Sequence, residues 1–334
     1  MKVVHEAKFA ELLQNFFTKR LIQQRNVSAC TVASYRDTFR LLLHFLNDAF
    51  GKQPSQISLE DLRAPVIEAF LHYLEIERGN SIRTRNNRFA AIRTFLVYAA
   101  AQEPCYLSTI QQVLAMPMKR FDRPRIEYLS RDEIAAIIEA ADGSTWSGRR
   151  DQVMFSTLYN TGARVSEIVA ATVKDVSLEV CSSIQLHGKG RKDRSIPLWK
   201  DTARQLRRWI KETDAQGNYP LFPNCSGAHL TRSGVEYRLR RLVATASSSF
   251  PSLKNRKISP HTIRHTTAMH LLQSDVDITV IALWLGHEST AITHMYVEAD
   301  IKMKERALAK VQEPKTRRSR YKPTDKLLHF LETL

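Results

Sequence analysis

Apolar residues recur at helical spacing through the first part of the chain. The stretches FAELLQNFFTKRLIQQ (residues 9–24) and TVASYRDTFRLLLHFLNDAF (residues 31–50) place apolar side chains three and four positions apart. This is the period of one face of an α-helix. A third stretch begins with Ser58 and has Asp61 three residues later, a spacing typical of a helical capping box. Residues 1–115 are therefore predicted to form a helical domain.

The last long helix predicted in this domain, residues 81–101, is also the most basic, and residues 78–93 hold five arginines and no acid. Its predicted buried stripe consists of Phe89, Ile92, Phe95 and Leu96. With that stripe in the core, Arg85 and Arg88 are expected to face outward together. Basic side chains on an exposed helix face can contact nucleic-acid phosphates. The candidates for such contacts are Arg83, Arg85, Arg88 and Arg93.

The composition changes at residues 116–126, whose sequence is MPMKRFDRPRI. Pro117 and Pro124 oppose a continuous helix, so this segment is predicted to be an extended linker. It holds four basic residues and one acid. Such a linker can lie along a phosphate backbone, with Lys119 and Arg120 as contacts, or it can be a solvated hinge. The composition favours the two interpretations about equally.

A second domain is predicted over residues 127–310. It starts with a capping box, Ser130 and Glu133, ahead of an apolar helix. A buried helix is then expected to end at Gly162, and a new helical segment follows it. The apolar period changes to two on both sides of HGKGRKDRS, which predicts a β-hairpin with a basic tip. Helices return to about residue 310, and a tail at 311–334 contains the basic run KTRRSRYK and a short amphipathic end. The predicted fold is mainly α, with a small β-sheet or hairpin in the C-terminal domain.

Charge and cysteine usage narrow the class of protein further. The formal net charge of +16 favours a polyanionic partner, although a basic protein without such a partner is the alternative. Four cysteines are scattered without a C-x-x-C pair, which argues against a disulfide scaffold and a zinc ribbon. The N-terminus lacks the features of a signal peptide, and no apolar run approaches the roughly 18 residues of a membrane span. We therefore expect a protein of the cytoplasm or the nucleoid, without a membrane partner.

The segment SPHTIRHTTAMHLL (residues 259–272) raises the question of a bound cation or a bound phosphate. His261 and His265 have the spacing of two metal ligands on one helix face, but Arg264 shares that face and would repel a cation. A phosphate fits better, because Ser259 is a predicted N-cap and the first turn of a helix offers free N–H groups and a positive dipole end. A capped helix with ordinary surface contacts is the alternative, and it is also the main interpretation of His265 and His270. We expect no metal and no cofactor.

Four separated motifs together resemble the tyrosine recombinase (phage integrase) family. They are TGARVSEI with Arg164, HGKGRKDRSIPL with Lys189, PHTIRHTTAMHLL with His261 and Arg264, and LGHESTAITHMY with His287 and Tyr296. The resemblance covers about residues 127–300, and the preceding helical domain and linker look like the family's core-binding domain. It implies a two-domain, C-shaped clamp around DNA.

The resemblance also implies a role for each motif residue. Tyr296 would attack a DNA phosphodiester, expel a 5′-hydroxyl and form a 3′-phosphotyrosyl link. Arg164 and Arg264 would clamp the non-bridging oxygens of the transition state. His261 would accept the tyrosine proton or hydrogen-bond the phosphate, and His287 would donate to a phosphate oxygen.

Two further roles follow from the same resemblance. Lys189, between Gly188 and Gly190 at the hairpin tip, would protonate the leaving 5′-oxygen. The neighbouring Arg191 and Lys192 could share the DNA contact. Glu167, three residues after Arg164, would hold that guanidinium by an ion pair, with a plain surface carboxylate as the alternative.

The implied function is site-specific recombination of double-stranded DNA through a Holliday junction held by four protomers, with a related recombinase as a further potential partner. A type IB topoisomerase that nicks and reseals DNA is one alternative. A catalytically silent architectural DNA-binding protein is another. The tail at residues 311–334 is expected to pack on its own domain or on a neighbouring protomer. Chromosome-dimer resolution, phage integration and transposition all fit the sequence, which leaves the target site undetermined.

Overall fold

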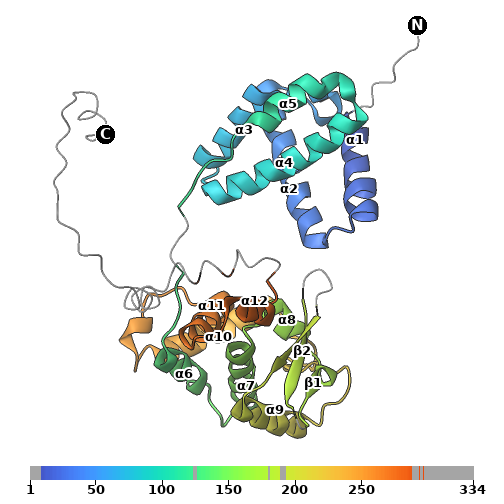
Figure 1. Ribbon diagram of the computed structural model, residues 1–334. Coiled ribbons are helices and arrows are strands. Elements are labelled where there is room, and N and C mark those ends of the chain that lie inside the picture. Colours follow the sequence, from blue (N-terminus) through green and yellow to red (C-terminus); the bar gives the residue numbers. More distant parts are fainter. Residues whose placement is uncertain are drawn as a thin grey trace, which may run out of the picture. The chain divides into compact units, whose positions relative to one another are not determined.

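The computed structural model describes residues 9–122, 126–179, 181–188 and 193–287, together with Thr293 and Tyr296. The chain divides into two compact units, Met1–Arg123 and Pro124–Leu334 (Figure 1). We call them the first unit and the second unit. The fold is mostly helical, as the sequence predicts, and the described strands all belong to the second unit.

Helices make up the first unit. They are α1 (Phe9–Asn15), the π-helix η1 (Phe16–Gln24), α2 (Ala29–Phe50), the 3₁₀ turns η2 (Pro54–Gln56) and η3 (Leu59–Leu62), α3 (Ala64–Ile76), α4 (Ile82–Gln102), the 3₁₀ turn η4 (Pro104–Tyr106) and α5 (Leu107–Ala115). Serine side chains start the two longest helices, because Ser28 accepts a hydrogen bond from the Thr31 amide and Ser81 from the Thr84 amide. An edge-to-face aromatic contact joins these two helices in the core, where the ring centroids of Phe39 and Phe95 lie 5.2 Å apart.

Two predicted helices of this unit are interrupted. Residues 9–24 are not one α-helix, since the chain passes into a π-helix at Phe16. The predicted capping box at Ser58 and Asp61 is present, but it begins only the short turn η3. Arg63 is then extended, and α3 starts at Ala64 with Pro65 in its first turn. Proline is tolerated there because the first amides of a helix have no intrahelical partner.

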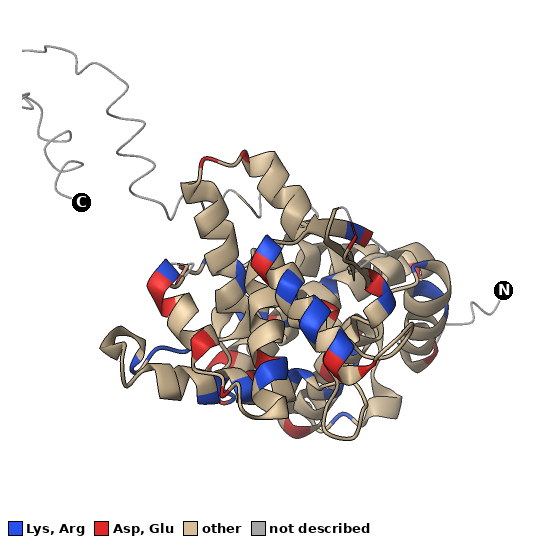
Figure 2. Ribbon diagram, turned by 90° about the horizontal axis from the view of Figure 1, so that it is seen from below, with Lys and Arg blue, Asp and Glu red and all other residues tan. Residues whose placement is uncertain are grey.

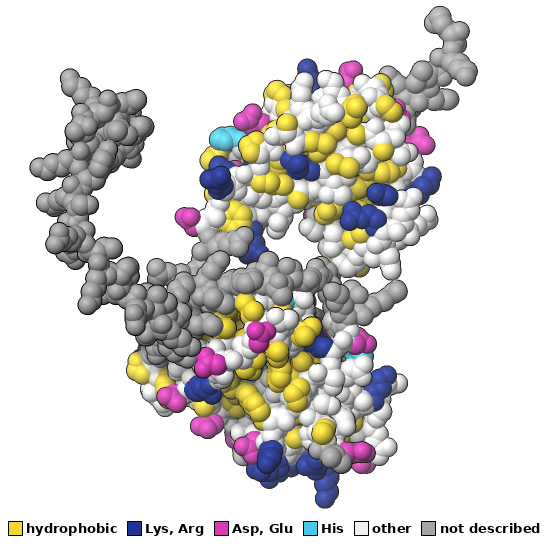
Figure 3. Space-filling view, viewed as in Figure 1, with side chains coloured by type: hydrophobic (Ala, Val, Ile, Leu, Met, Phe, Trp, Pro, Cys, Tyr) yellow, Lys and Arg dark blue, Asp and Glu magenta, His cyan; other side chains and the backbone are white. Residues whose placement is uncertain are grey.

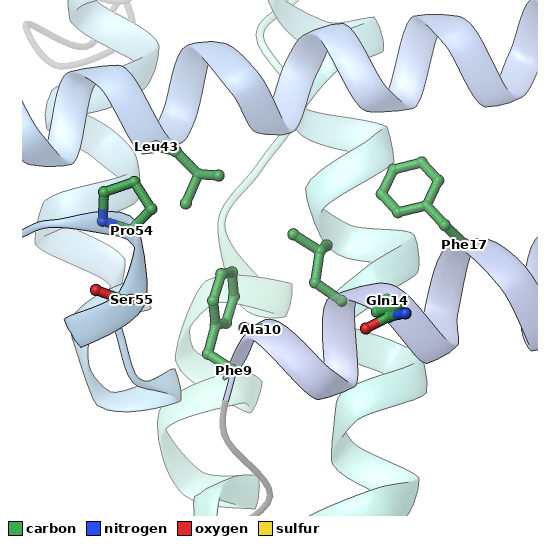
Figure 4. Close-up of a pocket in the computed structure, with 8 residues that line it drawn as sticks. Phe9, Ala10, Gln14, Phe17, Leu43, Pro54 and Ser55 are labelled. Carbon is green, nitrogen blue, oxygen red and sulfur yellow. The ribbon is translucent and has the colours of Figure 1, made fainter.

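An apolar pocket lies between α1, the start of η1, α2 and η2 (Figure 4). Its lining residues are Phe9, Ala10, Leu13, Gln14, Phe17, Leu43, Pro54 and Ser55. None of these side chains is titratable. The pocket therefore offers packing surface rather than groups for acid–base or nucleophilic chemistry.

The second unit is built around a buried helix. Its helices are α6 (Arg131–Glu139), α7 (Trp146–Thr161), α8 (Val165–Ala170), α9 (Lys200–Thr213), α10 (Arg232–Ala246), α11 (Pro260–Gln273) and α12 (Ile278–Leu285), with short 3₁₀ turns η5 (Val173–Asp175) and η6 (Pro251–Leu253). α7 packs against both α9 and α11, and its Met154, Phe155 and Leu158 are almost fully buried. The predicted capping box of Ser130 and Glu133 starts α6.

A small antiparallel sheet lies beside α8 in this unit (Figure 1). Within the described residues it has three strands, β1 (Val176–Ser177), β2 (Ser183–His187) and β3 (Asp193–Pro197), in that order. β2 and β3 are the predicted hairpin, with Ile184 directly opposite Ile196 on the buried face. The short strand β1 was not predicted, because two residues are too few to show a period of two.

None of the helices that the structure describes is both long enough and apolar enough to span a membrane.

Candidate active site

The start of α11 has the local structure that its sequence predicts. The Ser259 side chain accepts a hydrogen bond from the Thr262 amide, and Pro260 occupies the first helical position. His261 therefore lies in the first turn and Arg264 at the start of the second, whereas both were expected in the first turn. Their environments differ, because His261 is exposed whereas Arg264 is buried.

Arg264 is held by the ends of two other helices. Its Nη1 donates to the carbonyl of Gly162 at 2.7 Å, and its Nη2 donates to the carbonyl of Leu285 at 2.6 Å. These carbonyls end α7 and α12, where the helix dipole favours a cation. Burial lowers the pKa of Arg264 to about 10, so the guanidinium stays charged at neutral pH.

Gly162 itself is required by this arrangement. Its φ of +59° lies in the left-handed region, and a Cβ there would come within 2.5 Å of the Leu285 side chain. The turn after α7 therefore brings Arg164 and α8 next to α12.

Arg164 lies directly before α8. Its Nη2 donates to the carbonyl of Gly286 at 3.1 Å, one residue after the carbonyl that binds Arg264. Its Nη1 donates to Glu167 at 2.9 Å. The Arg164 side chain remains 30% exposed, so part of its guanidinium is open to solvent.

Glu167 is the predicted carboxylate partner of Arg164, and it is buried. It also accepts hydrogen bonds from a residue that the sequence reasoning missed, Arg194 of β3, at 2.7 and 3.1 Å. Burial alone would raise the pKa of Glu167, but the hydrogen bonds from Arg194 and Arg164 outweigh it and hold the pKa below its usual value.

A sequence signal for Arg194 did exist. With a period of two, Arg194 lies on the same strand face as Ile196, which is buried. An arginine on the buried face of a strand needs a carboxylate partner, and Glu167 was the acid already singled out.

Tyr296 is buried in the second unit, with 2% of its surface exposed. Its hydroxyl lies 2.9 Å from Nδ1 of His265, and its ring is nearly parallel to that of His287, with 6.3 Å between the centroids. Burial raises the pKa of Tyr296 to about 12, so the phenol is protonated at neutral pH. The main interpretation of His265 as a residue with ordinary surface contacts was therefore wrong.

His287 and His261 are the two histidines that the motifs predict to be catalytic. Burial, with Arg264 as the next cause, lowers the pKa of His287 to about 4, and its Nδ1 lies 2.8 Å from the Thr293 hydroxyl. The His261 side chain makes no hydrogen bond with any other residue that the structure describes. Although the His261 side chain reaches the surface, desolvation by the protein atoms around its ring lowers its pKa, and so do Arg264 and Arg164.

Lys189, Arg191 and Lys192 lie outside the described residues. They lie between β2 and β3 in the sequence, and His187 at the end of β2 contacts Asp193 at the start of β3. Its Nδ1 lies 3.0 Å from Asp193, and its Nε2 lies 3.3 Å from Asp175. Hydrogen bonds with Asp193 first and Asp175 second raise the pKa of His187.

The expectation that Arg85 and Arg88 face outward together was wrong. Arg85 is buried, and its Nε lies 3.3 Å from a Glu75 oxygen. Arg88 is half-buried, and burial lowers its pKa. The reason is helix periodicity: Arg85 lies four positions before Phe89, so it continues the buried stripe by one turn.

The other basic candidates of the first unit have varied surroundings. Arg83 and Arg120 are exposed and form no ion pair with a described residue. Arg93 donates to the Met116 carbonyl at 3.0 Å, and Lys119 binds Glu75 at 2.6 Å. On the face shown in Figure 3, the Lys and Arg side chains of this unit lie in separate places rather than in one patch.

The described residues contain no group of three His, Cys, Asp or Glu side chains arranged to hold a metal ion. His261 and His265, which have the spacing of a ligand pair, lie close enough to Arg264 for it to lower the pKa of both. A cation at this helix end would therefore meet a buried guanidinium.

Comparisons with known proteins identify the class. Residues 127–304 match the phage integrase family, and residues 15–103 match the N-terminal SAM-like domain of phage integrases. The chain is 45% identical over 328 residues to a putative integrase/recombinase of Sinorhizobium fredii, which covers 98% of this chain and 99% of the relative. It is 30% identical over 289 residues to the tyrosine recombinase XerC of Anoxybacillus flavithermus, covering 84% of this chain and 91% of the relative.

Solved structures support the fold. The XerH site-specific recombinase bound to its difH substrate aligns with a TM-score of 0.67 at 21% identity, covering 85% of this chain and 81% of that chain. The Tn1549 transposon integrase in complex with a circular intermediate DNA aligns with a TM-score of 0.68 at 18% identity, covering 90% of this chain and 99% of that chain.

These similarities define a site-specific DNA recombinase, an enzyme that transfers DNA strands. The chain belongs to the phage integrase family, that of the tyrosine recombinases. The resemblance read from the four motifs is confirmed, and so is the mainly helical fold. A topoisomerase and a silent architectural protein are not favoured.

Proposed function

We propose that this recombinase cleaves DNA with Tyr296 as nucleophile and with Arg164 and Arg264 as the clamp on the phosphate. Attack by the phenol would link the tyrosine to the 3′-phosphate and release a 5′-hydroxyl. Because the new diester resembles the bond that it replaces, the same site can reseal DNA without a nucleotide cofactor. Glu167 would support the clamp without reacting.

The observation that carries this proposal is an excess of fixed positive charge. Arg164 and Arg264 bind the carbonyls of consecutive residues, Gly286 and Leu285, so their guanidiniums converge on one turn of the chain. Among the described residues, Glu167 is the carboxylate that accepts a side-chain hydrogen bond from Arg164, and Arg194 shares it. The side-chain hydrogen bonds of Arg264 go to carbonyls instead. A phosphodiester would supply the missing negative charge and accept planar, bidentate hydrogen bonds.

The remaining roles follow from the family pattern. His261, exposed in the first turn of α11, would hydrogen-bond the phosphate or accept the tyrosine proton. His287 would donate to a phosphate oxygen, and Lys189 would protonate the leaving 5′-oxygen, with Arg191 and Lys192 beside it on DNA. None of these steps needs a metal ion.

We further propose that residues 1–115 form a core-binding domain, residues 116–126 a basic linker and residues 127–310 the catalytic domain of a clamp on DNA. Arg83 and Arg120 are its strongest candidates for phosphate contacts in the first unit, because both are exposed. Four protomers would hold two recombination sites through a Holliday junction, alone or with a related recombinase. The four cysteines are free, which supports action in the cytoplasm at the nucleoid.

A nicked suicide substrate tests the nucleophile. In a buffer that contains EDTA, the native protein is expected to become covalently attached to the 3′ end of the cleaved strand. Tyr296→Phe should bind the same DNA with unchanged affinity and trap none of it, because only the reacting hydroxyl is removed. Denaturing gels measure the covalent complex, and mobility shifts measure binding.

Tyr159→Phe is a matched control, since that hydroxyl is also bonded to a histidine of α11. Normal trapping by Tyr296→Phe would show that another residue is the nucleophile. Loss of cleavage in EDTA that one added metal restores would contradict the arginine clamp and favour a metal at His261 and His265.

A further inference from the structure

We propose that His265 is a catalytic residue of this recombinase: it binds the hydroxyl of Tyr296 and takes its proton as the phenol attacks phosphorus. The inference rests on the proposed role of Tyr296 as nucleophile. It goes further by separating two tasks that the sequence left together on His261. In this assignment His265 accepts the proton of the nucleophile, and His261 hydrogen-bonds the phosphate.

Geometry distinguishes the three histidines of the site. The Nδ1 atom of His265 lies 2.9 Å from the Tyr296 oxygen, which is hydrogen-bonding distance. His287 lies alongside the Tyr296 ring, and its Nδ1 is bonded to Thr293 instead. His261 is exposed and has no hydrogen-bond partner among the described residues. Within the described structure, His265 is therefore the imidazole that reaches the reacting oxygen.

Without DNA, the surrounding charges make His265 a weak base for the Tyr296 phenol, whose pKa is about 12. Burial first, then His261 and Arg264, lower the pKa of His265 to about 4, so its ring is neutral at neutral pH. A neutral ring with its proton on Nε2 offers the Nδ1 lone pair to the phenol. The other charged and titratable groups that face the pair are Arg264, His261 and His287. A bound phosphodiester would offset the positive charge of Arg264 and make His265 a stronger base once DNA is present.

No proton is gained or lost over one cycle of cleavage and rejoining. During cleavage the phenol O–H bond breaks, its proton moves to Nδ1 of His265, and the tyrosine oxygen bonds to phosphorus. The bond from phosphorus to the 5′-oxygen breaks, and that oxygen receives a separate proton from Lys189. Rejoining reverses each transfer, so His265 returns a proton to the departing phenol.

The same helix offers a matched control pair. The Nδ1 atom of His270 lies 2.8 Å from the hydroxyl of Tyr159, and this pair is also partly buried. Burial lowers the pKa of His270 as well. Tyr159 has no proposed part in the reaction. The cleavage rate of a His270 variant therefore shows how much is lost when such a hydrogen-bonded pair is removed for structural reasons alone.

The test measures single-turnover formation of covalent complex on a nicked suicide substrate, with saturating protein, from about pH 6 to about pH 9. The variants are His265→Ala, His265→Asn, His270→Asn and Tyr296→Phe. Asparagine keeps a hydrogen-bond acceptor near the Nδ1 position but cannot take a proton. DNA binding is measured for every variant, and His265→Asn alone decides the test if the alanine variant does not fold.

Both His265 variants are expected to cleave about 10²–10⁴-fold more slowly than the native protein at neutral pH, with DNA affinity unchanged. The deficit should shrink about tenfold for each added pH unit, because the solvent then removes the phenol proton. His270→Asn should stay within about threefold of the native rate at every pH.

Two results would overturn the inference: a native rate in His265→Asn, or a deficit that is the same at every pH, as a purely structural role predicts. Covalent trapping by Tyr296→Phe would instead contradict the proposed nucleophile. The two failures are therefore distinguishable.

Discussion

At the scale of single residues, the site depends on a few polar groups that lie out of water and are paired. Glu167 is buried and binds two arginines, while Arg264 is buried against two carbonyls. Leaving one member of such a set unpaired costs more free energy than the intact pair contributes. The ion pairs of Glu167 therefore maintain the charge geometry that the phosphate would meet.

Substituting Glu167 with glutamine is expected to lower the free energy of unfolding at pH 7. The loss should lie toward the lower end of about 3–5 kcal/mol, because Arg164 is 30% exposed and can be rehydrated. The folded-state pKa of Glu167 is lowered, so its stabilisation is complete above its unfolded pKa of about 4.3. That stabilisation disappears as the pH falls through the folded pKa.

Urea unfolding at pH 7 and at about pH 4 measures this effect, with Glu139→Gln as a control on an exposed carboxylate of the same unit. The difference between native protein and Glu167→Gln should narrow at the lower pH, whereas Glu139→Gln should change little at either. An equal difference at both pH values would mean that the Glu167 carboxylate is not ionised against its arginines.

At the scale of elements, α4 and α9 show how basic residues on a helix divide between core and surface. In α4 two of the four arginines, Arg85 and Arg88, turn toward the apolar core of the first unit. α9 lies at the bottom of Figure 1 and faces the viewer in Figure 2; its lysines and arginines line the surface of the second unit. α9 lies at the opposite end of that unit from α11 and α12.

Arg83→Ala combined with Arg120→Ala is expected to weaken DNA binding and its dependence on salt. Each lost phosphate contact should reduce the slope of log affinity against log salt by about one, or about two for the pair. Filter binding from about 50 to about 200 mM salt measures the slope. Covalent trapping at saturating protein should persist, because neither residue lies in the proposed active site.

The matched control is Arg208→Ala with Lys211→Ala on α9, which removes the same charge from exposed positions. It should shift affinity only slightly and leave the slope unchanged. Equal effects of the two double variants would show that net charge alone matters and that Arg83 and Arg120 contact no phosphate. Arg85→Ala is unsuitable for this comparison, since it leaves Glu75 without a buried partner.

At the scale of the whole molecule, the open question is how the chain assembles on DNA. The sequence after Tyr296 ends in KLLHFLETL, an amphipathic segment too short to be stable alone. This segment lies outside the described residues. Docking on a neighbouring protomer and packing on its own domain remain the two predictions for the tail.

Deleting residues 312–334 is expected to leave binding to a single site nearly intact and to reduce cooperative assembly on a two-site substrate. Recombinant yield should fall with assembly, because a docked tail would couple neighbouring protomers. Mobility shifts on one-site and two-site DNA measure both steps. Normal assembly and recombination would contradict docking, and an insoluble truncated protein would place the tail in its own core.

The sequence by itself determined whatever depends on local spacing. The caps at Ser130 and Ser259 were predicted from capping chemistry, and the hairpin of β2 and β3 was predicted from a period of two. The family could be identified from the sequence because each of its four motifs is a short run of neighbouring residues. These features require only a few neighbouring residues, so no tertiary contact was needed to predict them.

Only the tertiary structure decided which distant groups meet. Arg194 joins Glu167 across 27 positions, His265 joins Tyr296 across 31, and Arg264 joins Gly162 across 102. Burial of Arg85 likewise required knowing how far the core of the first unit extends along α4. Long-range pairing depends on how helices pack, and packing is set by the whole core rather than by any one segment. For this reason the candidate catalytic residues could be proposed from the sequence, while the partner of the Tyr296 hydroxyl could not.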